Sequence, residues 1–336
     1  MKDMRTLFLF AITGVAAVAQ TWVTMGAGGS ARTADDGTLE FKYELGTKQF
    51  AAAVLPSDGS VASMKSLRFR AKSDHDTTLG VLLGERKPGG GNYVALFWSP
   101  ANQWQQIELT PRDFDLSDGP TDPVDADGKL DLDQVEGIAI FDLAHFFEGA
   151  MDREKIVVTK STGAHTILID NFEVRASAPA RSENTIDAFD RGFLQWMTPG
   201  GMTLMWVPET GPLGEPSLKA TYQETTEPYA FLMRRVASLN LAKAKHLTFD
   251  IASENETTLL IALEMKQEAR YHLTIYPPAG RKIFHVDLSL DDFERESGTG
   301  PEKFDPSRWK SIAITDISGG NSANAFWLGN VRVKDE

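Results

Sequence analysis

The chain has 336 residues, 42% of them hydrophobic and 24% charged, and its formal net charge is −13. This composition predicts a soluble globular protein with enough residues for two domains of ordinary size. An acidic surface repels phosphate backbones, so no nucleic acid is expected as a partner. The absence of cysteine excludes disulfides, thiolate metal sites and a cysteine nucleophile.

The first 25 residues have the pattern of an export segment. Two basic residues lie among the first five, the apolar run Leu7–Ala19 follows, and the next charged residue is Arg32. This pattern, with small residues at its end, predicts a signal peptide cleaved after Ala19. An uncleaved membrane anchor is the alternative, because residues 6–25 are long enough to cross a lipid bilayer, with Trp22 at its outer interface. A buried first strand is a third alternative.

Alternating apolar and polar residues predict a series of short strands in the first half of the chain. Residues 22–34 are rich in Gly and Ala and are expected to be irregular. The expected strands follow at residues 39–45, 50–55, 65–85 (two strands and a turn), 93–98, 104–109, 135–143 and 165–174.

The second half repeats this course. Lys245–Met265 matches Lys65–Glu85 without a gap, at an offset of 180 residues. Later segments match in the same order, and the offset falls to 159 because the first copy carries an insertion near residues 144–164. A repeat of this size predicts duplicated structural units.

Many short strands with scarcely any helical period predict an all-β chain. We expect two tandem jelly-roll β-sandwiches after an N-terminal apolar segment. The expected boundaries are 1–25 for the signal peptide or anchor, 26–178 for the first domain, 179–184 for the linker and 185–336 for the second domain.

Three segments of the first copy carry a family resemblance: Trp104–Phe114, Gly137–Asp142 and Ile169–Val174. This pattern of core strands resembles the complex I intermediate-associated protein 30 family and the family 11 carbohydrate-binding modules. The resemblance implies a galactose-binding-like jelly roll. Such folds often hold a structural calcium near their terminal strands, where Asp170 could contribute. The second copy departs from the pattern at Gly329, which stands where the first copy has Asp170.

The acidic loop at residues 122–131 is a candidate calcium site, with Asp125 and Asp127 as ligands. The EF-hand pattern fails at both ends of this loop, at Pro123 and Gln134. A solvated acidic loop is therefore the alternative, and no cofactor other than a possible structural calcium is expected.

Two regions are candidates for protein interaction besides Trp22. The insertion contributes Phe146 and Phe147, either as a docking arm or as an exposed hairpin. The segment 196–206 gathers methionine and tryptophan, which are enriched at interfaces, and contributes Met202 and Trp206. An edge strand packed in the core is the alternative for that segment.

Exposed aromatic rings with polar neighbours are the residues that bind carbohydrate. Tyr93, Trp98, Trp104 and Tyr276 are candidates for such a site. Aromatic residues in a β-sandwich also fill its core, which is the alternative for all four.

No catalytic motif is present. The sequence has no nucleophile elbow, no HExxH and no phosphate-binding loop, and its six histidines show no ligand spacing. We therefore expect a non-catalytic, exported accessory or assembly (scaffold) subunit of a membrane protein complex, at the periplasmic or extracytoplasmic face. Its expected partners are the other subunits and, through residues 6–25, the lipid bilayer. The alternative is a periplasmic or secreted carbohydrate-binding protein.

Overall fold

The computed structural model of the protein describes residues 21–47, 49–57, 59–86, 89–117, 119, 122–150, 161–198, 202–222, 231–266, 269–297, 300–318 and 324–335, without the side chains of residues 147–150 and Ser297. Among these residues the chain forms two compact units. The first ends at Ala178, and the second begins at Pro179.

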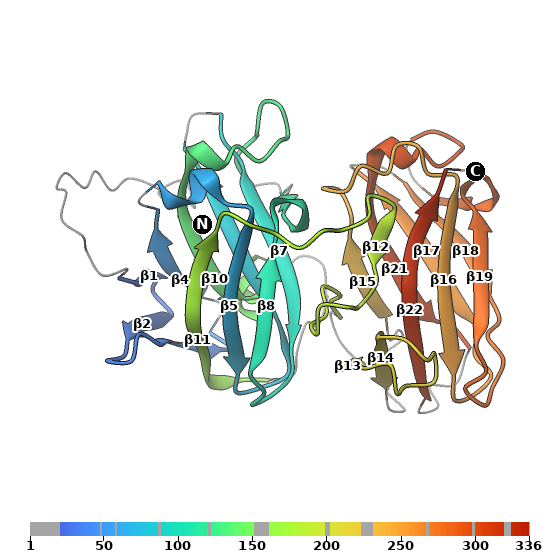
Figure 1. The fold of residues 1–336 in the computed structure, drawn as a ribbon, viewed down its shortest axis with the longest axis horizontal. Helices are drawn as coiled ribbons and strands as arrows, with labels where there is room; N and C mark the ends of the chain where they lie inside the picture. Colours follow the sequence, from blue (N-terminus) through green and yellow to red (C-terminus); the bar gives the residue numbers. More distant parts are fainter. Residues whose placement is uncertain are drawn as a thin grey trace. The chain divides into compact units, whose positions relative to one another are not determined.

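The first unit is a sandwich of two antiparallel sheets (Figure 1). The six-stranded sheet has the order β1 (Val23–Gly26), β4 (Ala51–Pro56), β10 (Val135–Asp142), β6 (Thr77–Glu85), β7 (Asn92–Ser99) and β9 (Asp115–Leu116). The five-stranded sheet has the order β2 (Gly29–Thr33), β3 (Leu39–Leu45), β11 (Gly163–Arg175), β5 (Ser66–Ser73) and β8 (Gln105–Leu109). One helix, α1 (Leu143–Ala150), follows β10, and short 3₁₀ turns lie at Ser60–Ser63, Pro111–Asp113 and Leu132–Gln134.

The second unit has two sheets of the same kind. One has the order β13 (Met202–Val207), β14 (Ser217–Tyr222), β22 (Asn324–Lys334), β16 (His246–Ser253) and β19 (Phe284–Ser289), and β12 (Thr185–Asp187) also pairs with β22. The other has the order β15 (Phe231–Arg235), β21 (Trp309–Asp316), β17 (Leu259–Met265), β18 (Arg270–Ile275) and β20 (Glu294–Ser297). Its 3₁₀ turns are Leu290–Asp292 and Pro306–Arg308.

The strand orders of the two units are the same, so the predicted all-β fold with two β-sandwiches is confirmed. The first unit differs by its additional edge strand β1, and the second by β12. The repeated segment forms β5 and β6 in one unit and β16 and β17 in the other. In both, its two strands belong to opposite sheets, so the acidic turn carries the chain from one sheet to the other.

Alternating side chains place the core of the first unit between its sheets. On β5 the residues Leu67, Phe69 and Ala71 are fully buried, while the residues between them are only partly buried. The ring of Phe69 meets that of Phe97 on β7 at a centroid distance of 5.9 Å. Full burial of one such side chain contributes about 1.5–3 kcal/mol to folding.

Residues 22–34 are not irregular, as the sequence led us to expect. They form β1 and β2, because backbone pairing with β4 and β3 compensates for their weak apolar pattern. Trp22 is 6% exposed and packs edge-on against Phe172 at 5.2 Å, so it is not available as an exposed interaction residue.

The described end of the predicted anchor therefore belongs to the first sandwich, where Met25 pairs with Ala52. Residues 6–20 of that anchor lie outside the described residues. Within the described part of the chain, no helix is long and apolar enough to cross a membrane.

The insertion begins as α1, which contacts β6 and β10 of the six-stranded sheet and β3 of the five-stranded sheet. Phe146 contacts Phe50 at a ring distance of 5.6 Å and Phe141 at 5.8 Å, so its ring packs on the sandwich and does not extend into solvent as a docking arm. The side chain of Phe147 lies outside the described residues, as do residues 151–160.

Candidate functional site

Trp104 lies on the outer surface of the five-stranded sheet of the first unit. In β8, Ile107 and Leu109 are buried in the core, whereas Gln106 is exposed. Because side chains alternate along a strand, Trp104 shares the outer face with Gln106. Its side chain is 39% exposed, so an aromatic ring is accessible to solvent at this position.

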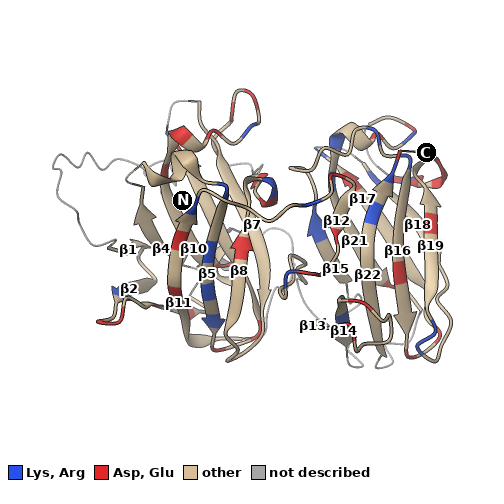
Figure 2. Cartoon of the chain, viewed as in Figure 1, with Lys and Arg blue, Asp and Glu red and all other residues tan. Residues whose placement is uncertain are grey.

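Basic residues of the neighbouring strand β5 flank this ring. The guanidinium carbon of Arg70 lies 5.0 Å from the centre of the Trp104 ring, and the Lys72 ammonium lies 5.4 Å from it. These are cation–π distances. Figure 2 shows the basic residues of β5 between acidic residues of β11 and β8.

Arg70 is held in place by Asp170 on β11. Its Nε donates to Asp170 Oδ1 at 2.7 Å, and a second bond joins Nη2 to Oδ2. The hydrogen bond to Asp170 raises the pKa of Arg70. Beside it, Gln106 Nε2 donates to the carbonyl of Phe69 at 2.8 Å. The outer face thus presents an aromatic ring surrounded by ordered polar groups, which we call the Trp104 face: Arg70, Lys72, Trp104, Gln106, Glu108 and Asp170.

Of the other aromatic candidates, Tyr276 of the second unit is 70% exposed, and the two on β7 are buried. Tyr93 is 2% exposed and Trp98 4%, and every other residue of β7 is buried as well. A buried ring cannot stack on an external sugar, which removes both residues as carbohydrate platforms.

The predicted calcium ligands do not form one site. Asp125 accepts hydrogen bonds from the Tyr93 hydroxyl and from the backbone N–H of Asp127 and Gly128, and Asp127 accepts one from Lys129 N–H. Burial acts to raise the pKa of Asp125, but the hydrogen bonds outweigh it and lower the pKa. Both carboxylates thus stabilise the conformation of the acidic loop. Asp170 instead lies on β11 in the five-stranded sheet and pairs with Arg70.

Met202 and Trp206 belong to the second sandwich. Met202 is 6% exposed on β13, and the indole N–H of Trp206 donates to the carbonyl of Phe189 at 2.6 Å. The structure supports the edge-strand alternative for Met202, because its side chain is buried and not presented as an interaction surface.

In the second unit, a loop covers part of the surface that corresponds to the Trp104 face. Leu213, from the connection between β13 and β14, packs in an apolar cluster with Ala252 and Trp327. A Cβ at Gly329 would lie 2.8 Å from both Leu213 and Glu215. The position that holds Asp170 in the first unit is therefore filled by a loop in the second.

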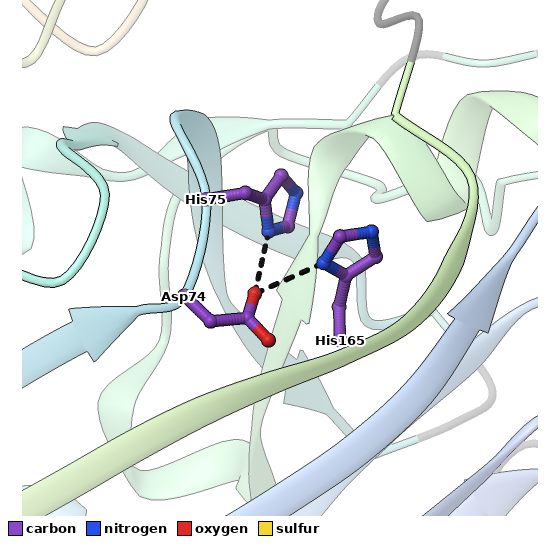
Figure 3. A group of neighbouring side chains, drawn as sticks. All are labelled: Asp74, His75 and His165. Carbon is purple, nitrogen blue, oxygen red and sulfur yellow. Dashed lines mark hydrogen bonds and ion pairs between the residues drawn. The ribbon is translucent and has the colours of Figure 1, made fainter.

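A second polar group lies at one end of the first sandwich. Asp74 and His75 follow β5 in the turn to β6, and His165 lies near the start of β11 (Figure 3). Asp74 Oδ1 is 2.9 Å from His75 Nδ1 and 3.0 Å from His165 Nδ1, and the two imidazole centroids are 4.0 Å apart. We call these three residues the His–Asp cluster.

A buried carboxylate supports this cluster. Asp142, at the end of β10, is fully buried, and its Oδ2 lies 3.1 Å from His75 Nε2. It also accepts hydrogen bonds from the hydroxyls of Tyr43 at 2.5 Å and Thr77 at 2.8 Å. Burial acts to lower the pKa of His75, but its contacts with Asp142 and Asp74 outweigh burial and raise that pKa.

The aromatic ring of Tyr43 is the centre of this end of the sandwich. The three histidines of the first unit, His75, His145 and His165, lie around it at centroid distances of 6.5, 5.2 and 6.0 Å. Burial raises the pKa of the Tyr43 hydroxyl well above its usual range, and Asp142 adds to the shift, so this hydroxyl stays a hydrogen-bond donor.

The sequence interpretation missed the His–Asp cluster because His75 and His165 are 90 residues apart. The repeat contained the signal that could have found it. The offsets of 180 and 159 residues align His75 with Asn255 and His165 with Asn324. These two histidines therefore occur in the first copy and not in the second.

No protein-family model matches the chain, and none of the curated proteins is detectably similar to it in sequence. Solved structures with partial similarity to the chain include carbohydrate-binding modules. A family 11 carbohydrate-binding module from Clostridium thermocellum, in complex with a β-1,3-1,4-mixed-linked tetrasaccharide, is 19% identical, with 45% of this chain and 94% of the module covered and a TM-score of 0.34.

Two further solved structures show the same kind of similarity. A family 30 carbohydrate-binding module of a Clostridium thermocellum cellulosomal cellulase is 16% identical, with 41% and 87% of the two chains covered and a TM-score of 0.32. An exo-β-agarase is 18% identical, with 46% of this chain and 25% of the agarase covered and a TM-score of 0.37. None of the matches supports membership of the complex I intermediate-associated protein 30 family.

Proposed function

We propose that the protein is a non-catalytic carbohydrate-binding protein and that it binds polysaccharide on the Trp104 face of the first unit. The observation that carries the proposal is the 39% exposed indole of Trp104, which lies on an open sheet surface among ordered polar side chains.

The chemistry of this face suits a sugar ring. A pyranose presents C–H groups on its faces and hydroxyls around its edge, so it needs an apolar surface bordered by hydrogen-bonding groups. The indole offers the apolar surface. Arg70 and Lys72 offer hydrogen-bond donors, and Asp170 and Glu108 offer acceptors. The sugar hydroxyls can therefore both accept and donate hydrogen bonds on this face.

The polar groups of the face are largely fixed before any ligand binds. The two bonds between Arg70 and Asp170 hold the guanidinium beside Trp104, and the bond from Gln106 to the Phe69 carbonyl fixes that amide. Side chains that are already ordered lose less conformational entropy when they bind a ligand, which favours affinity.

Binding is assigned to the first unit alone, because in the second unit Ile283 stands where the first has Trp104, and the Leu213 connection fills the position of Asp170. The second unit then has a structural role. Export, as predicted from the first 19 residues of the sequence, is part of the proposal, because it would bring the protein to polysaccharides outside the cytoplasm.

Affinity electrophoresis in native gels tests the proposal, with mixed-linked β-glucan, hydroxyethylcellulose and agarose as separate probes. The wild-type chain is expected to be retarded by at least one of them. Trp104→Ala removes the apolar platform and should weaken the apparent association at least about tenfold, which corresponds to about 1.4 kcal/mol.

Tyr276→Ala is the matched control, since Tyr276 is a 70% exposed aromatic residue of the second unit. Its retardation should equal that of the wild type, and Trp104→Phe should keep part of the binding. Equal retardation of wild type and Trp104→Ala would refute the site, and no retardation of the wild type by any probe would refute the function.

A further inference from the structure

The His–Asp cluster brings two imidazole nitrogens and a carboxylate oxygen together at one end of the first sandwich. The ligand atoms of Asp74, His75 and His165 all lie within 4.8 Å of one another. Figure 3 shows the Asp74 carboxylate directed at the Nδ1 atoms of both rings. Tetrahedral zinc holds its N and O ligands at about 2.0–2.1 Å, which places them roughly 3.3 Å apart. The observed spacings of 2.9 and 3.0 Å between Asp74 Oδ1 and the ring nitrogens need only a small expansion.

The opposite nitrogen of each ring already lies near a polar oxygen. His75 Nε2 lies 3.1 Å from the buried carboxylate of Asp142, and His165 Nε2 lies 2.8 Å from the Ser161 hydroxyl. Imidazoles that bind metals almost always have such a partner, which orients the ring and sets which nitrogen carries the proton. This arrangement directs both Nδ1 atoms toward the metal position.

The carboxylate is oriented in the same way. Asp74 Oδ2 accepts a hydrogen bond from the backbone N–H of Thr166 at 2.8 Å, so its Oδ1 faces the imidazoles. The side chain of Asp74 is 38% exposed, while those of His75 and His165 are each 12% exposed. An ion and a water ligand can therefore approach from the Asp74 side.

The second unit shows that the fold does not need these histidines. It keeps the supporting pair, with Tyr222 bonded to Asp316 as Tyr43 is bonded to Asp142. At the two histidine positions it has Asn255 and Asn324, and the Asn324 amide oxygen accepts from Asn255 N–H at 3.2 Å. A neutral amide is thus sufficient to hold the β16–β17 turn against β22. The presence of Asp74, His75 and His165 in the first unit is therefore not explained by the stability of the fold.

We propose that Asp74, His75 and His165 form a binding site for a zinc ion or a similar divalent transition metal. His75 Nδ1, His165 Nδ1 and one Asp74 oxygen are the protein ligands, and a water completes a tetrahedron. Each ring keeps its Nε2 proton, for Asp142 or Ser161, and any proton on Nδ1 is released to solvent. Two imidazoles and one carboxylate favour zinc over calcium or magnesium, which prefer oxygen ligands alone.

Isothermal titration of the tag-free, chelator-treated full chain with Zn²⁺ tests the site, with the visible absorption of bound Co²⁺ as a second readout. We expect one high-affinity ion per chain. His75→Asn and His165→Asn introduce the residues that the second unit has at these positions, so both variants should fold. Each should weaken Zn²⁺ binding by at least tenfold and abolish the tetrahedral Co²⁺ spectrum.

His246→Gln and His285→Gln are the matched controls. Each removes a histidine of the second unit that is paired with an aspartate, Asp287 and Asp250 respectively. Both controls should bind Zn²⁺ as the wild type does. The proposal is overturned if the wild type binds no stoichiometric Zn²⁺. It is also overturned if the His75→Asn and His165→Asn variants, with circular dichroism spectra like the wild type, bind the ion unchanged.

Discussion

Replacing Asp142 with alanine is expected to lower the free energy of unfolding of the first unit by about 3–5 kcal/mol. The fully buried carboxylate accepts hydrogen bonds from the hydroxyls of Tyr43 and Thr77 and from the backbone N–H of Ala144. Its loss leaves these buried donors without their acceptor, and an unsatisfied buried group costs about 1–3 kcal/mol. It also removes the carboxylate that lies 3.1 Å from His75 Nε2.

Urea denaturation of the full chain, monitored by hydrogen exchange of peptides from each unit, measures this effect unit by unit. A chelator in the buffer keeps metal binding out of the comparison. Asp316→Ala is the control in the second unit, where the carboxylate is only partly buried and binds Tyr222 and Ser318. Its cost should be smaller and confined to the second unit. A loss below about 1 kcal/mol for Asp142→Ala would contradict the role of this carboxylate.

Gly80→Leu is expected to destabilise the first unit by about 3 kcal/mol, at the upper end of the usual cost of overpacking a core. Gly80 on β6 pairs with Phe141 on β10, and a Cβ built at Gly80 would lie 2.3 Å from the Phe141 ring. In the second unit the large and small residues of this pair are exchanged, because Leu260 on β17 pairs with Thr315 on β21.

The double variant Gly80→Leu, Phe141→Thr introduces the pair of the second unit into the first. It should be more stable than the sum of the two single changes predicts, by at least about 1 kcal/mol, because each change makes room for the other. Urea denaturation of all four proteins measures this coupling. Additive effects would show that the two side chains do not share one space.

The sequence was sufficient for the architecture because strand alternation and the repeat are local signals that survive in both copies. It was insufficient for β1 and β2, where Gly- and Ala-rich segments show little alternation and are ordered by pairing with distant strands. Exposure on β7 could not be read from alternation either. Tyr93 and Trp98 point to opposite faces of the strand, yet both are buried.

For the candidate sites too, the sequence indicated residue types, whereas the contacts between them depended on the strand order. Trp104 was identified as a candidate from its residue type, but its cation–π contacts required knowing that β5 lies beside β8. The His–Asp cluster depends on β11 pairing with β5, which brings His165 to residues 90 positions earlier in the chain. Comparison of the two copies, position by position, is the sequence signal that would have revealed it.

Oxidative footprinting of the unmodified full chain tests most directly the claim that the Trp104 face binds carbohydrate. Hydroxyl radicals would be applied with and without a saturating mixed-linked β-glucan oligosaccharide, and mass spectrometry would follow oxidation at Trp104, Tyr276 and Met205, which are 39%, 70% and 54% exposed. We predict that the oligosaccharide lowers oxidation of Trp104 several-fold and leaves Tyr276 and Met205 unchanged. Unchanged oxidation of Trp104, or protection of Tyr276 or Met205 in its place, would contradict the proposed function.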